Sequence, residues 1–321
     1  MASTPLPTRR LGRDGPEVGA IGLGCVGMSA EYDPDRIDDA HSRRVLARAV
    51  ELGVSLFDTA DSYGPHHNES LLGRALRDHR NHVTIATKWG LVLDDRTGGY
   101  HPDGRPERAR GACEDSLRRL GTEILDLYFL HRVDPEVPIE ESWGAMVRLV
   151  EEGLVRSIGL CEADAATLDR AHRVHPVAAV QSELSLWTRG PLSEVLPWCA
   201  THGAAFLPYA PLGRGFLTGA VASADFSPDD IRAGNPRFTA EAIGRNQRIV
   251  REIERVAREH EATPAQISIA WLLARGPWVV PIPGTKRIAH LEENCGAARL
   301  DLPEEALSEL DRLPPPHGDR Y

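Results

Sequence analysis

The 321-residue sequence is poor in cysteine, in long apolar runs and in positive charge. Its five cysteines include no Cys-x-x-Cys pair, which argues against both a zinc site and a disulfide framework. No apolar run approaches membrane-spanning length, and the first residues lack the apolar stretch of a secretory signal. The 47 acidic residues exceed the 37 basic ones, a net charge of −10, so neither nucleic acid nor an anionic membrane is an expected partner. We therefore expect a soluble, cytoplasmic protein without a metal ion that acts on a small molecule.

Short apolar runs alternate with amphipathic segments along the chain. The predicted strands are Ala20–Leu23, Ser55–Phe57, Val83–Thr87, Leu125–Leu130, Val155–Gly159, Val177–Val180, Ala205–Leu207 and Val279–Ile282. The predicted helices are Asp38–Glu51, Glu69–Leu76, Glu107–Leu120, Ile139–Glu152, Ala163–His172, Ser193–Cys199, Ala240–His260 and Thr263–Ala274, the last with a capping box between Thr263 and Gln266. This alternation indicates a parallel sheet. Eight strands favour an α/β fold of the closed (β/α)8 TIM-barrel type over an open, doubly wound sheet.

Three further features complete the predicted architecture. Arg9–Gly15 and Glu17–Gly24 form a predicted N-terminal β-hairpin that could close the bottom of the barrel. Gly219–Phe238 is rich in proline and glycine and has no clear period, which is typical of a lid or a binding loop. We find no linker, so residues 1–321 are predicted to form a single barrel domain.

A literal Gly-x-Gly-x-x-Gly sequence covers Gly22–Gly27 and follows a predicted strand. The dinucleotide fingerprint also requires a helix to open at these glycines, so that the helix N-terminus meets the pyrophosphate. The residues that follow, Met28–Pro34, have no helical period and end in proline. We therefore interpret the glycines as a tight strand exit at the barrel mouth and not as a Rossmann site.

Four proton-handling side chains stand at or just past the ends of successive predicted strands. Asp58, Lys88 and His131 each follow an apolar run directly, and Tyr63 follows five residues after Asp58. In a parallel barrel the C-terminal ends of the strands form the active-site face. One such residue alone is more often part of a rim salt bridge, but four together predict a catalytic site. Asp61, between two of them, is expected to be a turn residue.

The chemistry of these four groups suits proton transfer. The pKa of a free tyrosine is about 10, and a nearby cation favours tyrosinate and lowers that pKa. Lys88 is the candidate cation for Tyr63, and Asp58 is the candidate carboxylate that keeps Lys88 charged. His131 is expected to hydrogen-bond the reacting oxygen or to relay its proton. None of the four donates hydride, so a reduction would need a cofactor.

The sequence resembles the aldo-keto reductases over nearly its whole length. The resemblance is carried by the ordered motifs Phe57–Gly64, Asn68–Gly73, Thr87–Lys88, Leu130–Arg132, Tyr209–Gly219, Pro283–Lys286 and Leu291–Asn294. It implies a barrel that binds NADPH without a Rossmann domain and reduces carbonyls, with the four residues above as a tetrad and Tyr63 as general acid. The loop Pro211–Gly215 is similar to that of the bacterial and fungal branch that includes pyridoxal-reductase-like enzymes.

The resemblance also implies which residues hold the cofactor. Gln181 would bond the nicotinamide carboxamide, Tyr209 would stack on the nicotinamide ring, and the basic pair that begins at Lys286 would favour NADPH over NADH. The full predicted set is Cys161, Glu162, Gln181, Tyr209, Ala210, Pro211, Leu212, Gly213, Arg214, Arg237, Gly284, Thr285, Lys286, His290, Glu293 and Asn294.

Two positions depart from the family pattern. Cys161 replaces a serine that is common at the carboxamide site, and a thiol is a poorer hydrogen-bond donor than a hydroxyl. Ala210 also replaces a commoner serine and removes a hydroxyl near the cofactor. Both substitutions leave open whether the grip on nicotinamide is altered, and Cys161 leaves open a redox role.

Substrate contacts are predicted for Tyr32 and Trp89, but the substrate itself cannot be read from the sequence. The segments Trp89–Arg105 and Ala220–Phe238 are the loops expected to build the pocket. Two other functions stay open. One is an NADPH-binding regulatory or sensor subunit with little turnover, and the other is a Schiff-base aldolase that uses Lys88. The tetrad favours carbonyl reduction over both.

Overall fold

Seven parallel strands form the central sheet of the structure. This computed structural model describes residues 6–32, 37–94 and 98–321. The strands follow chain order across the sheet, and two small hairpins lie outside it. The strand bounds are β3 Leu23–Gly24, β4 Leu56–Asp58, β5 Thr84–Trp89, β8 Leu125–Leu130, β9 Val155–Cys161, β10 Ala179–Glu183 and β11 Ala205–Tyr209. Seven of the predicted strands are thus confirmed, with their ends shifted by up to 3 residues.

The eighth strand position is held by residues 279–284 without a regular ladder. Val280 and Ile282 donate backbone hydrogen bonds to β11, and the carbonyls of Pro281 and Pro283 accept from the chain at β3. Isolated parallel bridges on both sides close the ring. Because proline has no N–H, Pro281 and Pro283 cannot donate the backbone hydrogen bonds that a full ladder with β3 requires. The fold is a (β/α)8 barrel, as predicted, but the prediction of a regular eighth strand is wrong.

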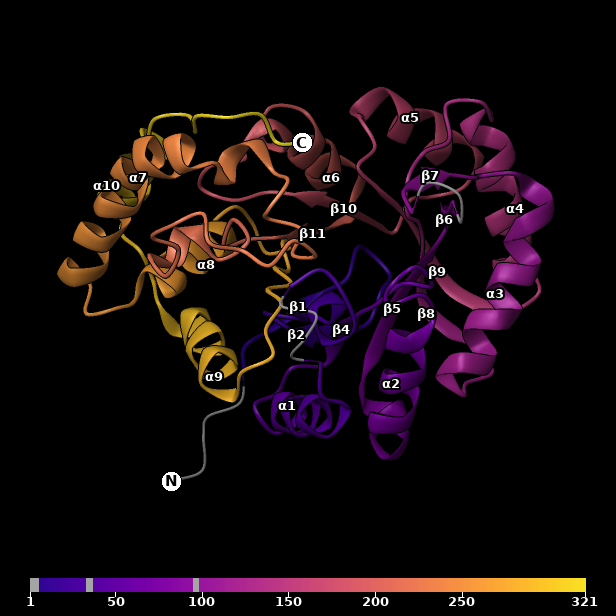
Figure 1. The fold of residues 1–321 in the computed structure, drawn as a ribbon. Coiled ribbons are helices and arrows are strands. Elements are labelled where there is room, and N and C mark those ends of the chain that lie inside the picture. The colour runs from indigo at the N-terminus through magenta and orange to yellow at the C-terminus, as the bar shows by residue number, and fades with distance from the viewer. Residues whose placement is uncertain (1–5, 33–36, 95–97) are drawn as a thin grey trace.

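Helices surround the barrel (Figure 1). Their bounds are α1 Asp39–Glu51, α2 His67–Ala75, α3 Pro106–Leu120, α4 Ile139–Glu151, α5 Ala165–Val174, α6 Val195–His202, α7 Ala240–Glu259, α8 Pro264–Leu273, α9 Ile288–Gly296 and α10 Glu304–Asp311. Thr263 caps α8 and forms the predicted capping box with Gln266. Helices α9 and α10 are absent from the predicted set, although Pro303 followed by two glutamates at α10 is a typical helix start. Across the described ranges, no helix is long and apolar enough to cross a membrane.

An N-terminal hairpin closes one end of the barrel, as predicted. β1 (Thr8–Arg10) pairs antiparallel with β2 (Glu17–Gly19). Leu11 and Val18 belong to the same buried cluster as apolar residues from the inside of the sheet, such as Leu127. The hairpin therefore fills the bottom of the lumen with apolar side chains and leaves the end where the strands terminate for the functional site.

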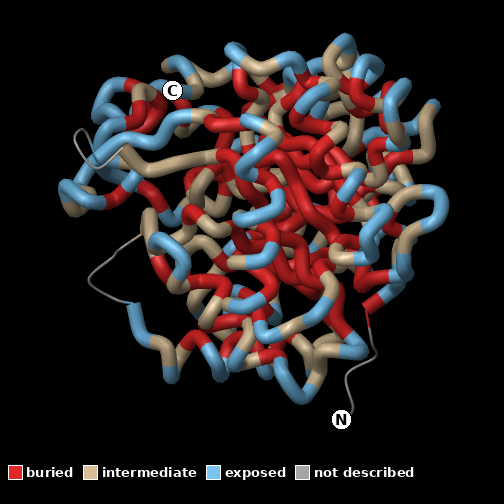
Figure 2. Tube along the Cα trace, turned by 90° about the vertical axis from the view of Figure 1, so that its right-hand side faces the viewer, coloured by how far each residue is buried: buried red, intermediate tan, exposed pale blue. Residues whose placement is uncertain are grey.

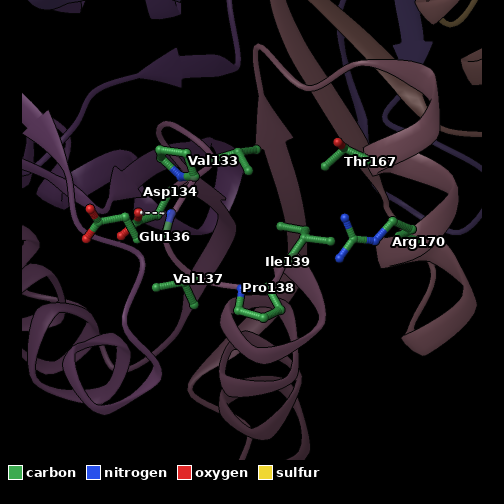
Figure 3. Close-up of a pocket in the computed structure, with 9 residues that line it drawn as sticks. Val133, Asp134, Glu136, Val137, Pro138, Ile139, Thr167 and Arg170 are labelled. Atoms are coloured by element: carbon green, nitrogen blue, oxygen red, sulfur yellow. Dashed lines mark hydrogen bonds between the residues drawn. The ribbon is translucent and has the colours of Figure 1, made fainter.

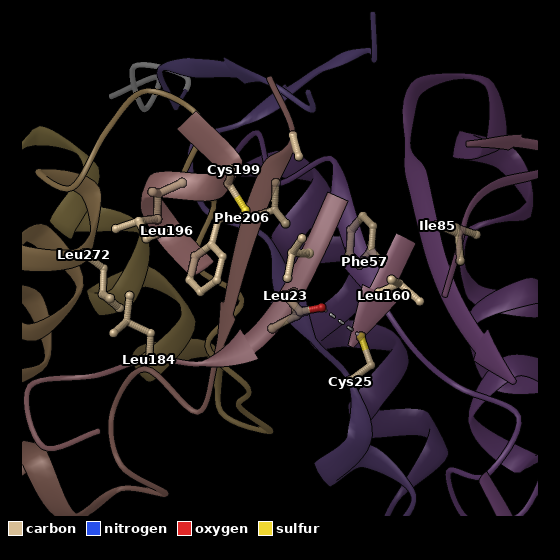
Figure 4. Packing of buried hydrophobic residues seen from close by; sticks show 14 of the residues in the cluster. Leu23, Cys25, Phe57, Ile85, Leu160, Leu184, Leu196, Cys199, Phe206 and Leu272 are labelled. Atoms are coloured by element: carbon tan, nitrogen blue, oxygen red, sulfur yellow. Dashed lines mark hydrogen bonds between the residues drawn. The ribbon is translucent and has the colours of Figure 1, made fainter. Parts of the chain in front are cut away.

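Strand periodicity divides the core into a lumen and an outer layer, because successive side chains point to opposite faces of a sheet. In β4, Leu56 lies in the lumen cluster and Phe57 in the outer cluster, and in β8 the same holds for Phe129 and Tyr128. The buried part of the chain gathers at the centre of the molecule (Figure 2). Figure 4 shows the outer layer, in which strand residues pack beside helix residues, among them Leu23, Phe57, Leu160, Phe206, Leu196, Cys199 and Leu272. Each large apolar side chain buried in this way stabilises the fold by about 1.5–3 kcal/mol.

Two buried polar residues at the start of α2 hold three elements together. Glu69 accepts hydrogen bonds from Thr87 of β5 at 2.6 Å and from Arg119 of α3 at 2.5 Å. Asn68 accepts from Thr59 at 2.7 Å and donates to the backbone just after β3 at 2.9 Å. Both side chains are fully buried, so these bonds offset the cost of removing polar groups from water. The motif that begins at Asn68 is therefore a structural brace behind the loop after β4.

Asp61 lies in a turn, as predicted, but its environment is unfavourable for a carboxylate. One of its oxygens is buried and has no hydrogen-bond partner within the described residues. Burial, followed by the charge of Glu69, raises the pKa of Asp61 to about 7. The folded state therefore binds a proton at this site at pH values where the unfolded chain has released it.

We predict that Asp61→Asn removes a pH dependence of stability. Because the pKa of about 7 in the fold exceeds the unfolded value of about 3.9, the free energy of unfolding falls as pH rises between these two values. The variant should gain stability over the wild type at about pH 8, relative to their difference at about pH 5. Denaturant unfolding at both pH values measures this, with the exposed Asp301→Asn as control. Equal differences at the two pH values would contradict the prediction.

We predict that Gly159→Ala destabilises the barrel by about 1–3 kcal/mol or more. A Cβ at this position of β9 would lie 2.4 Å from the ring of Phe129 and 2.5 Å from the carbonyl oxygen of Ala179. Gly144→Ala in α4 is the matched control, because an added Cβ there meets nothing within 4 Å. It should stabilise the helix by up to about 1 kcal/mol. Denaturant unfolding measures the free energy of unfolding of both variants. An unchanged value for Gly159→Ala would contradict close packing of the lumen wall at this position.

Candidate active site

The strand period brings three of the predicted catalytic residues to the open end of the lumen. Asp58, Lys88 and His131 each stand two residues beyond an apolar lumen residue of the same strand. Side chains two residues apart in a strand share a face, so all three point into the barrel. Each is buried.

Lys88 is the centre of the site. Its Nζ donates to Asp58 Oδ2 at 2.8 Å, to the carbonyl of Thr59 at 2.8 Å and to the hydroxyl of Tyr63 at 3.1 Å. The ammonium has three donors, so these contacts use its full capacity. The side chain is 0% exposed, and a buried ammonium is tolerated only when it is paired and hydrogen-bonded. The structure therefore confirms the predicted contacts among these three side chains.

The predicted lowering of the pKa of Tyr63 is wrong for this structure. Desolvation comes first and the charge of Asp58 second, and together they raise the pKa of Tyr63 well above its ordinary value. Although Lys88 lies beside the hydroxyl, it does not outweigh these effects. Tyr63 therefore keeps its proton at neutral pH, and the raised pKa makes its hydroxyl a weaker acid than a free tyrosine.

His131 is held beside Tyr63 as a neutral imidazole. Its Nδ1 lies 3.3 Å from the hydroxyl oxygen of Ser62, and its ring meets that of Tyr63 edge to face with centroids 5.8 Å apart. Burial, then the charges of Lys88 and Arg132, lower the pKa of His131 well below its ordinary value. In the tautomer in which Ser62 donates to Nδ1, the ring proton lies on Nε2. Ser62 was not predicted as a site residue; its place one residue before Tyr63 was the available signal.

Gln181 and Cys161 extend the lumen face of the site along β10 and β9. Gln181 Nε2 donates to Asp58 Oδ1 at 2.7 Å, so the predicted cofactor residue also contacts the tetrad directly. That bond leaves the amide oxygen and the second N–H of Gln181 for other partners. Cys161 is buried, and desolvation raises the pKa of its thiol to about 12. Since the thiolate is the reactive form, this environment disfavours a redox role.

Charged groups gather at the ends of β9, β10 and β11. Glu162 follows β9, Glu183 ends β10 and Tyr209 ends β11. Arg320 donates to both glutamates and to the hydroxyl of Tyr209. Neither Glu183 nor Arg320 was predicted. Glu183 could have been predicted, because it lies two residues after Gln181 and side chains two apart in a strand share a face. No residue near Arg320 in the sequence indicates that it lies at the strand ends.

The loop after β11 turns tightly through Ala210, Pro211, Leu212, Gly213 and Arg214. Ala210 and Arg214 both adopt positive φ, at 46° and 55°. A Cβ on Gly213 would lie 2.7 Å from the ring of Trp187, so only glycine fits there. The Arg214 side chain is 6% exposed and lies 3.6 Å from Glu183.

The predicted cofactor residue Arg237 is engaged in internal contacts. Its Nη1 donates to Thr188 at 2.6 Å, its Nε donates to the carbonyl of Gly318 at 3.3 Å, and the residue is 7% exposed. The guanidinium therefore joins the end of the long loop to Thr188 and to the backbone of Gly318. A direct contact with the cofactor stays a prediction.

The remaining predicted cofactor residues lie between the eighth strand position and α9. Gly284 is exposed and pairs with Gly24 of β3 through an isolated parallel bridge. A Cβ on Gly24 would lie 2.9 Å from the carbonyl oxygen of Ile282, so this glycine allows the two segments to approach closely. Lys286 Nζ donates to the carbonyl of Tyr32 at 2.6 Å. Thr285 accepts a hydrogen bond from the backbone N–H of Arg287, the N-cap of α9. On that helix, His290 is exposed, Glu293 is partly buried and Asn294 is buried.

The two predicted substrate residues lie in different environments. Trp89 is 1% exposed and packs in the outer layer against Tyr128, because it neighbours Lys88 in β5 and so points away from the lumen. Its assignment as a pocket wall is therefore wrong. Tyr32 is partly exposed, with the guanidinium of Arg232 5.5 Å from its ring centroid.

A small hairpin, β6 (Leu91–Leu93) and β7 (Tyr100–Pro102), forms within the predicted pocket loop, whose residues 95–97 lie outside the described ranges. Tyr100 from this hairpin donates to the carbonyl of Ser62 at 2.9 Å. The hairpin therefore folds against the turn that carries Tyr63. That this loop builds the substrate pocket stays a prediction.

A surface cavity of about 350 Å³ lies between the loop after β8 and α5 (Figure 3). It is lined by Val133, Asp134, Pro135, Glu136, Val137, Pro138, Ile139, Thr167 and Arg170. None of the predicted site residues is among them. Within the described ranges, no group of three or more His, Cys, Asp and Glu residues is arranged to hold a metal ion.

Comparison with known proteins agrees with this geometry. The sequence model of the Aldo/keto reductase family matches residues 20–314. A probable aldo-keto reductase 1 of Glycine max is 43% identical over 315 residues, which cover 97% of this chain and 89% of that protein. The predicted placement in a bacterial and fungal branch stays a prediction, and this relative is a plant protein.

Solved structures of similar proteins share the fold. A glycerol dehydrogenase from Gluconobacter oxydans is 30% identical, with a TM-score of 0.85 and coverage of 95% of this chain and 94% of its own. An aldo/keto reductase from Klebsiella pneumoniae, solved in complex with NADP and acetate, is 29% identical, with a TM-score of 0.73 and 98% coverage of both chains. The chain belongs to the aldo/keto reductase family.

Proposed function

We propose that this protein reduces an aldehyde or a ketone to an alcohol, with NADPH as hydride source and Tyr63 as general acid. As a member of the aldo/keto reductase family it is an oxidoreductase with NADP(H) as cofactor. One group carries the proposed mechanism. The buried ammonium of Lys88 donates hydrogen bonds to both the carboxylate of Asp58 and the hydroxyl of Tyr63.

The residues present fit such a cofactor. Gln181 and Tyr209 line the lumen beside the tetrad, where a nicotinamide would have to lie to reach the substrate. Lys286 and Arg287 directly precede the N-terminus of α9, and a helix N-terminus with added positive charge suits a phosphate group. When bound there, NADPH supplies the hydride for the carbonyl carbon.

The four residues supply the proton that the product oxygen needs. Tyr63 holds it at rest, because desolvation raises the pKa of its hydroxyl. When Tyr63 gives the proton to the carbonyl oxygen, negative charge develops on the phenolic oxygen 3.1 Å from Lys88 Nζ. The cation stabilises that charge, and the carboxylate of Asp58 pairs with Lys88 Nζ at 2.8 Å. Neutral His131 offers its Nε2 proton to the same carbonyl oxygen and so orients it.

The two alternative functions are less well supported. A Schiff base needs a neutral amine, whereas all three donors of Lys88 are engaged and Asp58 favours the ammonium. The chain has only two lysines, Lys88 and Lys286, so borohydride trapping with a carbonyl compound followed by peptide mapping is a clean test. A sensor subunit would not need the complete tetrad.

A steady-state screen tests the function as a whole. NADPH oxidation should accelerate with at least one class among aldehydes, ketones, pyridoxal and keto-sugars. Tight NADPH binding without turnover on any class would favour the sensor function, and borohydride-dependent labelling of Lys88 would favour the aldolase.

We predict that Tyr63→Phe lowers kcat for carbonyl reduction by about 10²–10⁴, the usual contribution of a general acid. The dissociation constant of NADPH should stay within about twofold, because the ring and its packing remain. Tyr128→Phe is the matched control: its hydroxyl is buried in the outer layer and has no hydrogen-bond partner among the described residues. Turnover by the Tyr63 variant at the wild-type rate would remove Tyr63 from the mechanism.

We predict that Lys286→Met weakens NADPH binding by about 10-fold or more, the loss expected for one charge-assisted hydrogen bond. NADH affinity should change little, because NADH lacks the 2′-phosphate. Fluorescence titration of both cofactors measures the ratio, and Lys286→Arg serves as the charge-preserving control. An equal loss for both cofactors would place Lys286 elsewhere than at the 2′-phosphate.

A further inference from the structure

Residues 313–321 lead from α10 back to the barrel mouth along α7. Asn246 of α7 donates to the carbonyl of His317 at 3.0 Å and accepts from its N–H at 2.7 Å. Asn235, at the end of the long loop, donates to the carbonyl of Arg320 at 2.9 Å. In Figure 1 this segment is the yellow trace that passes α7, and its end contacts β10 through Arg320 and Glu183. The segment is thus fixed to the fold by specific polar contacts.

The side chain of Arg320 joins the ends of three successive strands. Nη1 and Nη2 donate to the two oxygens of Glu162, after β9, at 2.7 and 2.8 Å. Nε donates to Glu183 of β10 at 2.8 Å. Nη2 also donates to the hydroxyl of Tyr209 of β11 at 2.7 Å. A planar guanidinium fixes its partners in orientation as well as in distance, which a lysine cannot do.

The partners of Arg320 surround the place proposed for nicotinamide. Tyr209 packs against the lumen cluster and would present its ring to the nicotinamide, and Glu162 directly follows Cys161 at the carboxamide site. Glu183 is 1% exposed, so its carboxylate depends on paired cations. Arg320 therefore holds the stacking ring and the carboxamide loop in one rigid arrangement before any cofactor arrives.

We propose that Arg320 is a positioning residue for the nicotinamide end of the cofactor, and that docking of residues 313–321 and binding of nicotinamide are coupled. This inference rests on the proposed function, because it assigns Tyr209 and Glu162 to the nicotinamide. Arg320 acts by limiting rotation of the Tyr209 ring and movement of Glu162, so less freedom is lost when the cofactor binds. By linkage, a bound nicotinamide stabilises the docked segment to the same extent.

Binding of two ligands by Arg320→Met tests the proposal. NADP⁺ carries the nicotinamide, and 2′,5′-ADP carries only the adenosine and phosphate end. The variant should bind NADP⁺ about 10-fold or more weakly, since several charge-assisted bonds are lost, and bind 2′,5′-ADP within about twofold of the wild type. Arg312→Met, an exposed arginine at the end of α10, is the matched control and should leave both affinities unchanged. Equal weakening for both ligands, or none for either, overturns the proposal.

Two further variants keep the test informative if Arg320→Met impairs folding. Arg320→Lys preserves positive charge beside both glutamates but cannot form the forked contacts, so it should show a smaller loss that is still selective for NADP⁺. A lysine variant identical to the wild type would show that charge alone suffices and would overturn positioning. Tyr209→Phe should lower NADP⁺ affinity, and Arg320→Lys should then have a smaller effect in that background. Failure of the wild type to bind NADP⁺ would instead reject the proposed function.

Discussion

The buried ion pair between Lys88 and Asp58 is the interaction on which the rest of the site depends. An ammonium without a partner in this environment would lose its proton or unfold its surroundings, and removing one member of a buried pair typically costs about 3–5 kcal/mol. The barrel supplies what the pair needs: a carbonyl from Thr59, the hydroxyl of Tyr63 and the amide of Gln181 all converge on it. The same arrangement that makes the charge tolerable places a cation beside the hydroxyl of Tyr63.

Closure of the barrel brings these groups together. Asp58 ends β4 and Gln181 lies in β10, with three other strands between them in the sheet, yet their side chains are 2.7 Å apart across the lumen. The tetrad is therefore coupled to the opposite wall, where the nicotinamide is proposed to lie. Behind the sheet, Glu69 anchors α2 to β5 and α3 and so supports the turn that carries Tyr63. The proposed proton-transfer site and the proposed nicotinamide site thus share one rigid frame.

The parts of the site that the sequence predicted are those governed by local pattern. An apolar run that ends in a charged residue identified Asp58, Lys88 and His131, because the period of a strand and the polarity of a parallel barrel decide where such a residue lies. The same rule, applied one residue further, would have placed Trp89 on the outside. The pKa of Tyr63 could not be predicted in this way, because desolvation and the charge of Asp58 act through space.

The sequence by itself determined the family, the alternation of strands and helices, which four side chains meet at the barrel mouth and that the early glycines do not open an α-helix. Only the tertiary structure decided how the eighth position closes around two prolines, which face Trp89 occupies and which charges meet at the mouth. Arg320 lies 158 residues from Glu162 along the chain and 2.7 Å from it in space. No local pattern encodes such a contact, because it arises when the chain closes into a ring and its end returns to the strands.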